Sequence, residues 1–189
     1  MEPYLTASKA LYPVLRRAVI LLVVAGVAVV AAGCGQGPST GVLSGAFVAP
    51  SNQCGIPGEA EQFSARVFEL VNEERANAGL APLAANAVLA EIAADYACEM
   101  IEGEFFDHTS PISGSTVGSR ALEGGYYFKK VGENLAGGQT SPEQVMAEWM
   151  ASPGHLANIL DEDFVELGIA VRTGGSYGWY WVQEFGLPR

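Results

Sequence analysis

The sequence predicts an α+β layered domain with an antiparallel sheet. Apolar residues recur at helical spacing through the first part of the chain after the N-terminal segment, whereas strand-like runs rich in aromatic and β-branched residues close it. Helices that come before strands, with no internal repeat, are typical of this class. The chain has 189 residues, a length that suits one domain and a linker once an N-terminal signal is set aside.

An export signal is predicted at the N-terminus. Basic residues precede fifteen uninterrupted apolar residues, 18–32, and small residues lead directly to Cys34. A membrane span needs about 20 apolar residues, so cleavage is favoured over a membrane anchor. The segment resembles a lipobox, and we expect residues 1–33 to be removed and Cys34 to be lipidated. An ordinary secretory signal and an uncleaved anchor remain the alternatives, because Ala31 stands where lipoboxes usually carry leucine.

The predicted mature chain is acidic. Removing residues 1–33 takes away three basic residues and one acidic residue, so the formal net charge goes from -11 to -13. Scattered basic residues in an acidic domain are poorly suited to neutralising phosphates or anionic lipid head groups. Nucleic acid is therefore not an expected partner.

A linker and a cysteine pair come next. Residues 34–57 are rich in Gly, Ser, Pro and Thr, which predicts a flexible tether ahead of a domain that covers residues 58–189. If Cys34 carries lipid, Cys54 and Cys98 are left, and an even pair in an exported chain predicts one disulfide. The alternative is two reduced cysteines, with Cys98 as a small buried apolar side chain.

Two long helices follow from the periodicity. Apolar residues recur at helical spacing over residues 59–78, and Gly79 stands where a helix would stop. Asn86 suits the cap of a second helix that runs to about residue 103. The buried stripe of this helix is expected to consist of Leu89, Ile92, Ala93, Tyr96 and Met100.

Shorter helices are expected in the middle of the chain. A turn-rich stretch, residues 107–118, leads to a short helix over 119–123. Ser141-Pro142-Glu143-Gln144 predicts another helix start, since serine can cap, proline is tolerated at the first position and glutamine completes a capping box. This helix is expected to end before Pro153-Gly154.

A hairpin is expected to close the domain. Residues 165–172 and 178–185 have strand character, and the Gly-rich residues 173–176 suit the turn between them. The aromatic side chains in this part of the chain are expected to be core residues: Trp149, Trp179, Tyr180, Trp181 and Phe185.

The two histidines are candidate site residues. His108 and His155 lie in segments that the sequence predicts to be irregular, beside small, Pro or Gly residues, where both could line a cleft. Neutral imidazole binds divalent metals and exchanges protons near neutral pH. From spacing alone, a structural hydrogen-bonding role for each histidine is the alternative.

Five ordered motifs resemble those of the CAP superfamily, which includes cysteine-rich secretory proteins, insect venom allergens and plant pathogenesis-related proteins. The resemblance covers about residues 60–187, and the chain is similar to short bacterial secreted members. The motifs are LVNEER (70–75), FDHTSP (106–111), GENL (132–135), EWMASPGHLANIL (148–160) and WVQEFG (181–186).

The resemblance implies a three-layer α-β-α sandwich with a central cleft that collects two histidines and two acidic residues. Carried over to this sequence, these are His108, His155 and Glu133, while the second acidic position falls on Ser152, so the set is incomplete. Glu148 lies one helical turn before Ser152, and its partial substitution for the missing acid is a hypothesis.

The resemblance also bears on metals. His108, His155 and Glu133 could hold zinc or a similar divalent metal, directly or through water. With Ser152 in an acidic position, we expect only weak binding and no required cofactor. The neighbouring Asn134 and Asn158 are interpreted as hydrogen-bonding scaffold.

The favoured function is a non-enzymatic binding module, exported, lipid-anchored to the cell membrane and facing the cell envelope or exterior. CAP proteins are associated with lipid and sterol binding, so the ligand would be small and lipid-like, or an envelope partner, with a monomer favoured. The Gly-x-Ser-x-Gly pattern occurs only at residues 37–41 and 174–178, in the predicted tether and across the predicted hairpin turn, so neither match is a strand-to-helix elbow, and the sequence has no His-Glu-x-x-His motif. One alternative is a hydrolase, peptidase-like, in which Glu133 or a histidine activates water, Ser110 or Ser152. The other is a structural surface protein with a vestigial cleft.

Overall fold

The computed structural model describes residues 53–189. The predicted signal peptide, Cys34 and most of the predicted tether lie outside the described residues. No helix within residues 53–189 has the length and apolar character needed to cross a membrane.

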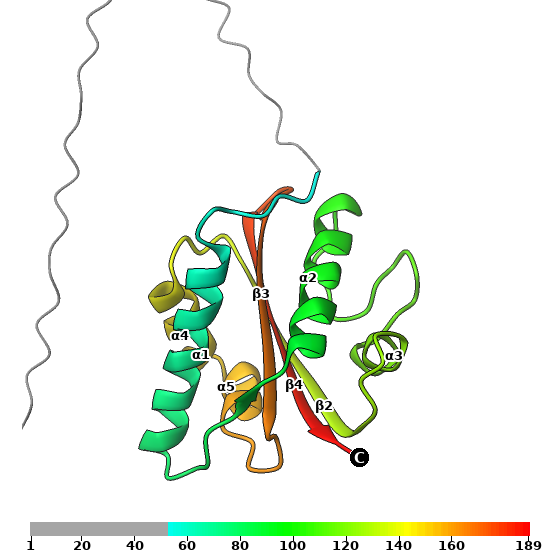
Figure 1. Ribbon diagram of the computed structural model, residues 1–189. Helices are drawn as coiled ribbons and strands as arrows, with labels where there is room; N and C mark the ends of the chain where they lie inside the picture. Colours follow the sequence, from blue (N-terminus) through cyan, green and yellow to red (C-terminus); the bar gives the residue numbers. More distant parts are fainter. Residues whose placement is uncertain (1–52) are drawn as a thin grey trace, which may run out of the picture. The chain divides into compact units, whose positions relative to one another are not determined.

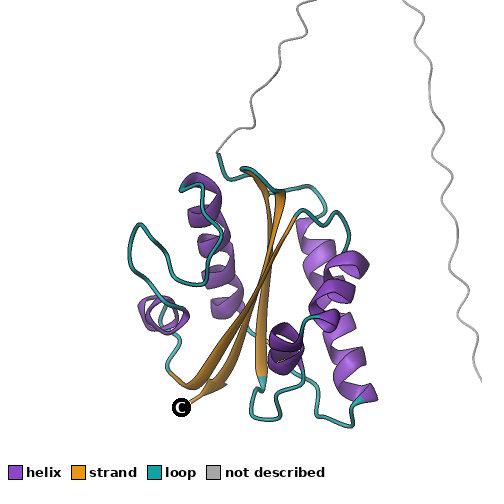
Figure 2. Ribbon diagram, turned by 180° about the vertical axis from the view of Figure 1, so that it is seen from behind, coloured by secondary structure: helices purple, strands orange, loops and turns teal. Residues whose placement is uncertain are grey.

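A four-stranded sheet lies between two layers of helices (Figure 1). One layer holds α1 (Ala60–Asn77), α4 (Pro142–Ala151) and α5 (Pro153–Ile159). The other holds α2 (Ala87–Glu102) and α3 (Val117–Glu123), and the view from behind shows both layers flanking the sheet (Figure 2). The strands are β1 (Ala84–Ala85), β2 (Phe128–Gly137), β3 (Glu166–Gly174) and β4 (Gly178–Pro188). The predicted α+β class and the three-layer sandwich are confirmed.

The sheet order is β1-β3-β4-β2, and β2 therefore lies at an edge. The three long strands pair antiparallel, as predicted, while the two residues of β1 add a short parallel pairing to β3. Residues of β2 alternate between the two helical layers, so Leu135 packs with the α2 layer and Ala136 with the α1 layer.

Local signals account for the helices that were predicted. The side chain of Asn86 accepts hydrogen bonds from the backbone N–H groups of Val88 (2.9 Å) and Leu89 (3.1 Å) and so caps α2. Ser141 caps α4 by accepting from the N–H of Gln144, with Pro142 in the first turn.

Besides the short β1, which was not predicted, two elements differ from the sequence prediction. Residues 153–159, expected to be irregular, form α5, because Pro153 is compatible with the first turn of a helix and starts a new one directly after Ser152. Strand β2 was not predicted at all. Its sequence, FKKVGENLAG, carries charges and glycines, and its residues 133–136 are all buried, so polar and apolar positions do not alternate.

The predicted disulfide is confirmed, since Cys54 is bonded to Cys98 of α2. Next to it, Gly55 pairs with Thr173 at the end of β3 through two backbone hydrogen bonds of 2.7 and 2.9 Å. The start of the described chain is therefore attached both to the helical layer of α2 and to the sheet.

Candidate functional site

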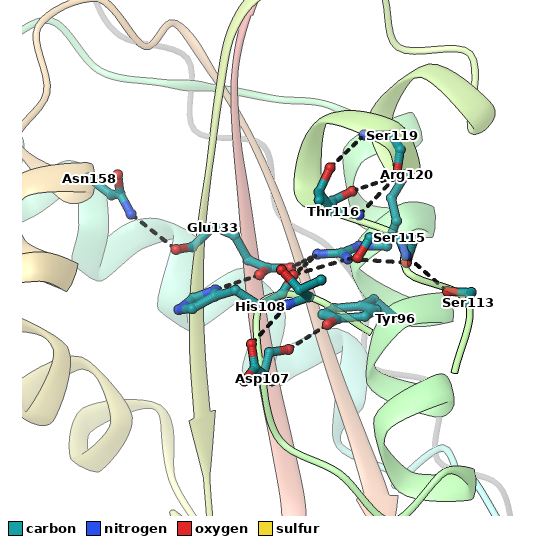
Figure 3. Close-up of polar contacts among 11 residues, drawn as sticks. Tyr96, Asp107, His108, Ser113, Ser115, Thr116, Ser119, Arg120, Glu133 and Asn158 are labelled. Carbon is teal, nitrogen blue, oxygen red and sulfur yellow. Dashed lines mark hydrogen bonds and ion pairs between the residues drawn. The ribbon is translucent and has the colours of Figure 1, made fainter. Parts of the chain in front are cut away.

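The candidate site is built around Glu133 on the edge strand β2 (Figure 3). Its side chain is 2% exposed, and its two carboxylate oxygens have different partners. Nδ1 of His108, from the loop after α2, lies 2.6 Å from Oε1 of Glu133. Nη2 of Arg120, from α3, donates to Oε2 at 2.6 Å. The structure thus brings together His108 and Glu133, and it adds Arg120, which sequence reasoning missed.

Arg120 connects this site to the loop that carries His108. Its guanidinium donates to the carbonyl oxygen of His108 from both Nη1 (3.2 Å) and Nη2 (3.3 Å), and to that of Ser115. The same guanidinium lies 3.3 Å from the centre of the Tyr96 ring, and the Tyr96 hydroxyl donates to the carbonyl oxygen of Asp107. The position of His108 therefore depends on Arg120 and Tyr96 as well as on Glu133.

A second buried acid, Glu184, lies beside Glu133. The two residues are directly opposite each other in the pairing of β2 with β4, and Glu184 is 2% exposed. Burial raises the pKa of Glu184 well above its usual range, and the neighbouring Glu133 charge raises it further. Sequence reasoning also missed Glu184. The available signal was a lone acidic residue in an otherwise uncharged strand.

The two histidines have opposite electrostatic surroundings. The hydrogen bond to Glu133 raises the pKa of His108, against a smaller effect of burial. Burial lowers the pKa of His155, and the charge on His108 lowers it further. The two shifts therefore favour the charged form of His108 and the neutral form of His155.

A chain of amide groups connects His155 to the sheet. The Asn134 side chain donates to the backbone carbonyl of His155 (3.1 Å) and to Gln183 (3.0 Å). Asn158 donates to the backbone carbonyl of Glu133 (3.0 Å) and to Asn134 (2.9 Å). Both asparagines act as the hydrogen-bonding scaffold that the sequence suggested, and Asn158 covers part of the open edge of β2.

A cavity of about 300 Å³ lies beside His155. Its polar lining includes Ser152, His155 and Glu148, whereas His108 and Glu133 are not among its lining residues. Glu148 is exposed and accepts a hydrogen bond from Gln139, so it reaches this cavity but makes no hydrogen bond to either described histidine. The apolar lining consists of Phe106, Leu135, Ala136, Trp149 and Tyr177, with Gly137 beside them.

The residues expected to hold a metal do not gather into one group. Within residues 53–189, no three His, Cys, Asp or Glu side chains are placed to hold a metal together. Both oxygens of Glu133 already face His108 and Arg120. Nε2 of His108 and the ring nitrogens of His155 are the atoms left to bind a metal. Metal binding by these two imidazoles therefore stays a prediction.

Ser110 is not placed as a nucleophile. It is 1% exposed, and its hydroxyl donates to Oε1 of Glu99 at 2.6 Å. Its oxygen also accepts from the backbone N–H groups of Ile112 and Ser113. These bonds give Ser110 a structural role in the loop that follows His108.

The chain is similar to several known proteins. It is 36% identical over 129 residues to YkwD of Bacillus subtilis (strain 168), covering 68% of this chain and 49% of that one. It is 32% identical over 106 residues to the membrane protein YlbC of the same organism, covering 56% of this chain and 30% of that one. The chain thus spans half or less of the length of these relatives.

Solved structures share the fold. An extracellular SCP-domain protein from Bacillus anthracis str. Ames matches with a TM-score of 0.62 and 30% identity, covering 68% of this chain and 41% of that one. An outer surface protein from Borrelia burgdorferi matches with a TM-score of 0.63 and 22% identity, covering 68% of this chain and 95% of that one. The sequence model of the CAP family (cysteine-rich secretory protein family) matches residues 68–185. With that match over most of the domain, the chain belongs to the CAP family of cysteine-rich secretory proteins.

Proposed function

We propose that this domain is an exported, membrane-tethered binding module that takes a small ligand into the cavity beside His155. The observation that carries the proposal is the lining of that cavity. One part is apolar and mostly aromatic, and the other offers hydrogen-bonding groups on Gln139, Glu148, Ser152 and His155. Apolar walls with a few polar groups are typical of small-molecule sites.

The lining also describes the ligand. A volume of about 300 Å³ is at the small end for ligand sites, so the cavity suits a small molecule or one end of a larger lipid-like one. Its polar end would face Ser152, whose side chain makes no cap hydrogen bond to α5, and the His155 ring. A neutral His155, favoured by its lowered pKa, can both donate and accept a hydrogen bond.

Hydrolysis is less well supported. A hydrolase needs an accessible nucleophile, a base within hydrogen-bonding reach and a group that orients the base. Ser110 is buried in structural hydrogen bonds, and His108, the histidine that Glu133 orients, does not line the cavity that contains Ser152. These observations favour binding over catalysis.

The membrane tether rests on the sequence around Cys34 and on extracellular relatives such as the Bacillus anthracis protein. Mass spectrometry of the chain purified from membranes is expected to show a lipid on Cys34. The Cys34→Ser variant is expected to appear in the soluble or secreted fraction. Wild-type chain with an unmodified Cys34 would rule out the lipid anchor while leaving the binding proposal intact.

The binding proposal is tested by native mass spectrometry of the full chain. A small molecule is expected to co-purify with the wild type and to be lost in Ser152→Phe, which fills the cavity without removing a cap hydrogen bond. Ala151→Phe is the matched control, because Ala151 is exposed and does not line the cavity. Wild-type protein without ligand would favour the vestigial cleft, and ligand retained in Ser152→Phe would overturn this cavity as the binding site.

A divalent metal is a second candidate ligand, favoured by one observation. Oε1 of Glu133 lies within hydrogen-bonding distance of Nδ1 of His108, so Nε2 lies on the side of the ring away from this carboxylate. Metal-bound histidines commonly have the same arrangement, with one ring nitrogen on the metal and the other hydrogen-bonded to a carboxylate. We expect weak binding of zinc through His108 and His155. In an NMR titration with Zn²⁺ both imidazoles should shift together, and His108→Ala should abolish the shift of His155. Independent or absent shifts would contradict a shared ion.

A further inference from the structure

We propose that the end of the domain where the chain enters from Cys34 rests on the lipid bilayer. This end, called the tether end, consists of residues 53–58, 137–142 and 173–178. The proposal depends on the lipid anchor proposed above and goes beyond it, because an anchor alone does not fix which side of a domain meets the membrane.

The three segments form one rigid end of the sheet (Figure 1). Gly55 pairs with Thr173, and the Cys54–Cys98 bond holds the same segment to α2. The loop after β2 is attached to β4, since the N–H of Gly138 donates to the carbonyl of Trp179 at 2.9 Å. In the other direction, the indole of Trp181 donates to the carbonyl of Gln139 at 2.8 Å.

The three segments of the tether end carry no charged side chain themselves, although exposed acidic residues flank them. These are Glu59 before α1 and, at the end of α2 whose Cys98 is bonded to Cys54, Glu102 and Glu104. The opposite end of the sheet differs, with Lys129, Lys130 and Arg189 beside the acidic residues 161–163. Moving charges against a bilayer costs free energy, because they lose hydration. The three uncharged segments are therefore the part of this end that can approach a membrane at the lowest cost.

Exposed apolar side chains stand at the tether end. Ile56 is 73% exposed and Tyr177 is 49% exposed. Tyrosine suits the region between lipid tails and water because its ring is apolar and its hydroxyl is polar. Nineteen residues, 35–53, lie between the proposed lipid on Cys34 and Cys54 at the tether end. Tethering raises the effective concentration of the bilayer surface, and a weak contact is then sufficient.

The contact would place the proposed ligand site at the membrane surface. Tyr177 belongs to the tether end and also lines the cavity beside His155, where its ring lies 5.0 Å from that of Phe106. Gly137 and Gln139, from the same end, line this cavity too. A lipid-like ligand could then pass between bilayer and cavity without crossing water.

Hydrogen exchange on lipid vesicles tests the proposal. The full lipidated chain is placed on phosphatidylcholine vesicles and compared with soluble Cys34→Ser, while flotation with the vesicles reports the anchor separately. We expect backbone amides in residues 53–58 and 173–178 to exchange about fivefold more slowly on the vesicles. Ile56→Glu with Tyr177→Glu should remove this protection and leave flotation unchanged. The control pair is Val88→Glu with Val165→Glu, which are 37% and 43% exposed and lie away from the tether end.

The outcomes separate the two proposals. Chain that floats without protection at the tether end overturns the contact and leaves the anchor standing. Chain that does not float removes both. If the protection instead increases with the number of protein molecules per vesicle, the tether end contacts a second copy of the chain rather than lipid, which overturns the proposal. Because Glu59 and Glu61 directly follow the first segment, protection should weaken on anionic vesicles at low salt.

Discussion

Glu133 and Glu184 face each other across β2 and β4 with both side chains buried and within hydrogen-bonding reach. Two carboxylates cannot share a buried hydrogen bond unless one of them carries a proton. Arg120 and His108 both contact Glu133, whereas burial, and then the nearby Glu133 charge, raise the pKa of Glu184. Glu184 is therefore the carboxyl of the pair that keeps a proton more readily, and Glu133 is the one that holds His108.

The stability of Glu184 variants should depend on whether the new side chain can donate a hydrogen bond to Glu133. Glu184→Gln keeps a hydrogen-bond donor for Glu133, so urea denaturation should show a loss of less than about 1 kcal/mol. Glu184→Leu leaves a Glu133 lone pair without its donor and should cost about 1–3 kcal/mol. A glutamine variant less stable than the leucine variant would contradict a protonated Glu184.

Arg120 should be the more costly residue to remove. Arg120→Met leaves the buried Glu133 charge without its guanidinium, and breaking such a pair typically costs about 3–5 kcal/mol. Adding Glu133→Gln should recover part of the loss. Arg66→Met, which removes ion pairs on an exposed surface, is the control and should leave the free energy of unfolding close to that of the wild type. Equal losses for the two arginines would contradict this account.

The histidines should titrate on opposite sides of pH 6.5. Because Glu133 raises the pKa of His108, the stability from its charged form is complete below pH 6.5 and is lost as the pH rises through the folded-state pKa. Because burial and the His108 charge lower the pKa of His155, stability falls as the pH drops below 6.5 and through the folded-state pKa of His155. NMR can follow both, since the chain has only two histidines.

Two variants check the causes of these shifts. Glu133→Gln should bring the pKa of His108 down, because it removes the carboxylate that favours the imidazolium. His108→Ala should raise the pKa of His155, because it removes the positive charge near that ring. An unchanged His155 titration in His108→Ala would leave burial as its sole cause.

Local signals explain which parts of the fold the sequence predicts. Caps at Asn86 and Ser141 are chemical features of a few neighbouring residues, so the starts of α2 and α4 are predictable. Strand β2 is different, because its edge is covered by side chains from distant helices. The indole of Trp149 donates to the carbonyl of Leu135 (3.2 Å), and Asn158 covers that of Glu133. Such long-range partners have no signature within the strand itself.

In the candidate site, too, some residues could be predicted from the sequence and others depend on long-range contacts. The resemblance to CAP proteins pointed to His108 and Glu133, and the structure joins them. Arg120 and Glu184 lie 13 and 51 residues from Glu133 in sequence and meet it only through helix packing and strand register. A lone charge in an apolar segment signals a buried partner, but it does not identify that partner.

The disulfide should stabilise the domain strongly. Cys54 and Cys98 are 44 residues apart, and closing a loop of that length is worth about 4 kcal/mol in the chain-entropy model. Cys54→Ser with Cys98→Ser should lower the free energy of unfolding by about that amount. The wild type with reducing agent should match the double variant. A loss below about 1 kcal/mol would mean that the reduced chain keeps this loop closed by other contacts.

Ser110 and Ser152 should respond in opposite ways, and their comparison separates binding from hydrolysis. Ser110→Ala removes the acceptor of two backbone N–H groups and the donor to Glu99, so it should cost about 1–3 kcal/mol of stability. Its ligand retention in native mass spectrometry should stay close to that of the wild type, because Ser110 does not line the cavity. Ser152→Ala loses no cap hydrogen bond and should unfold like the wild type while retaining less ligand. Labelling of Ser110 by a serine-directed activity probe would contradict this assignment, since a hydroxyl that is 1% exposed should be out of reach.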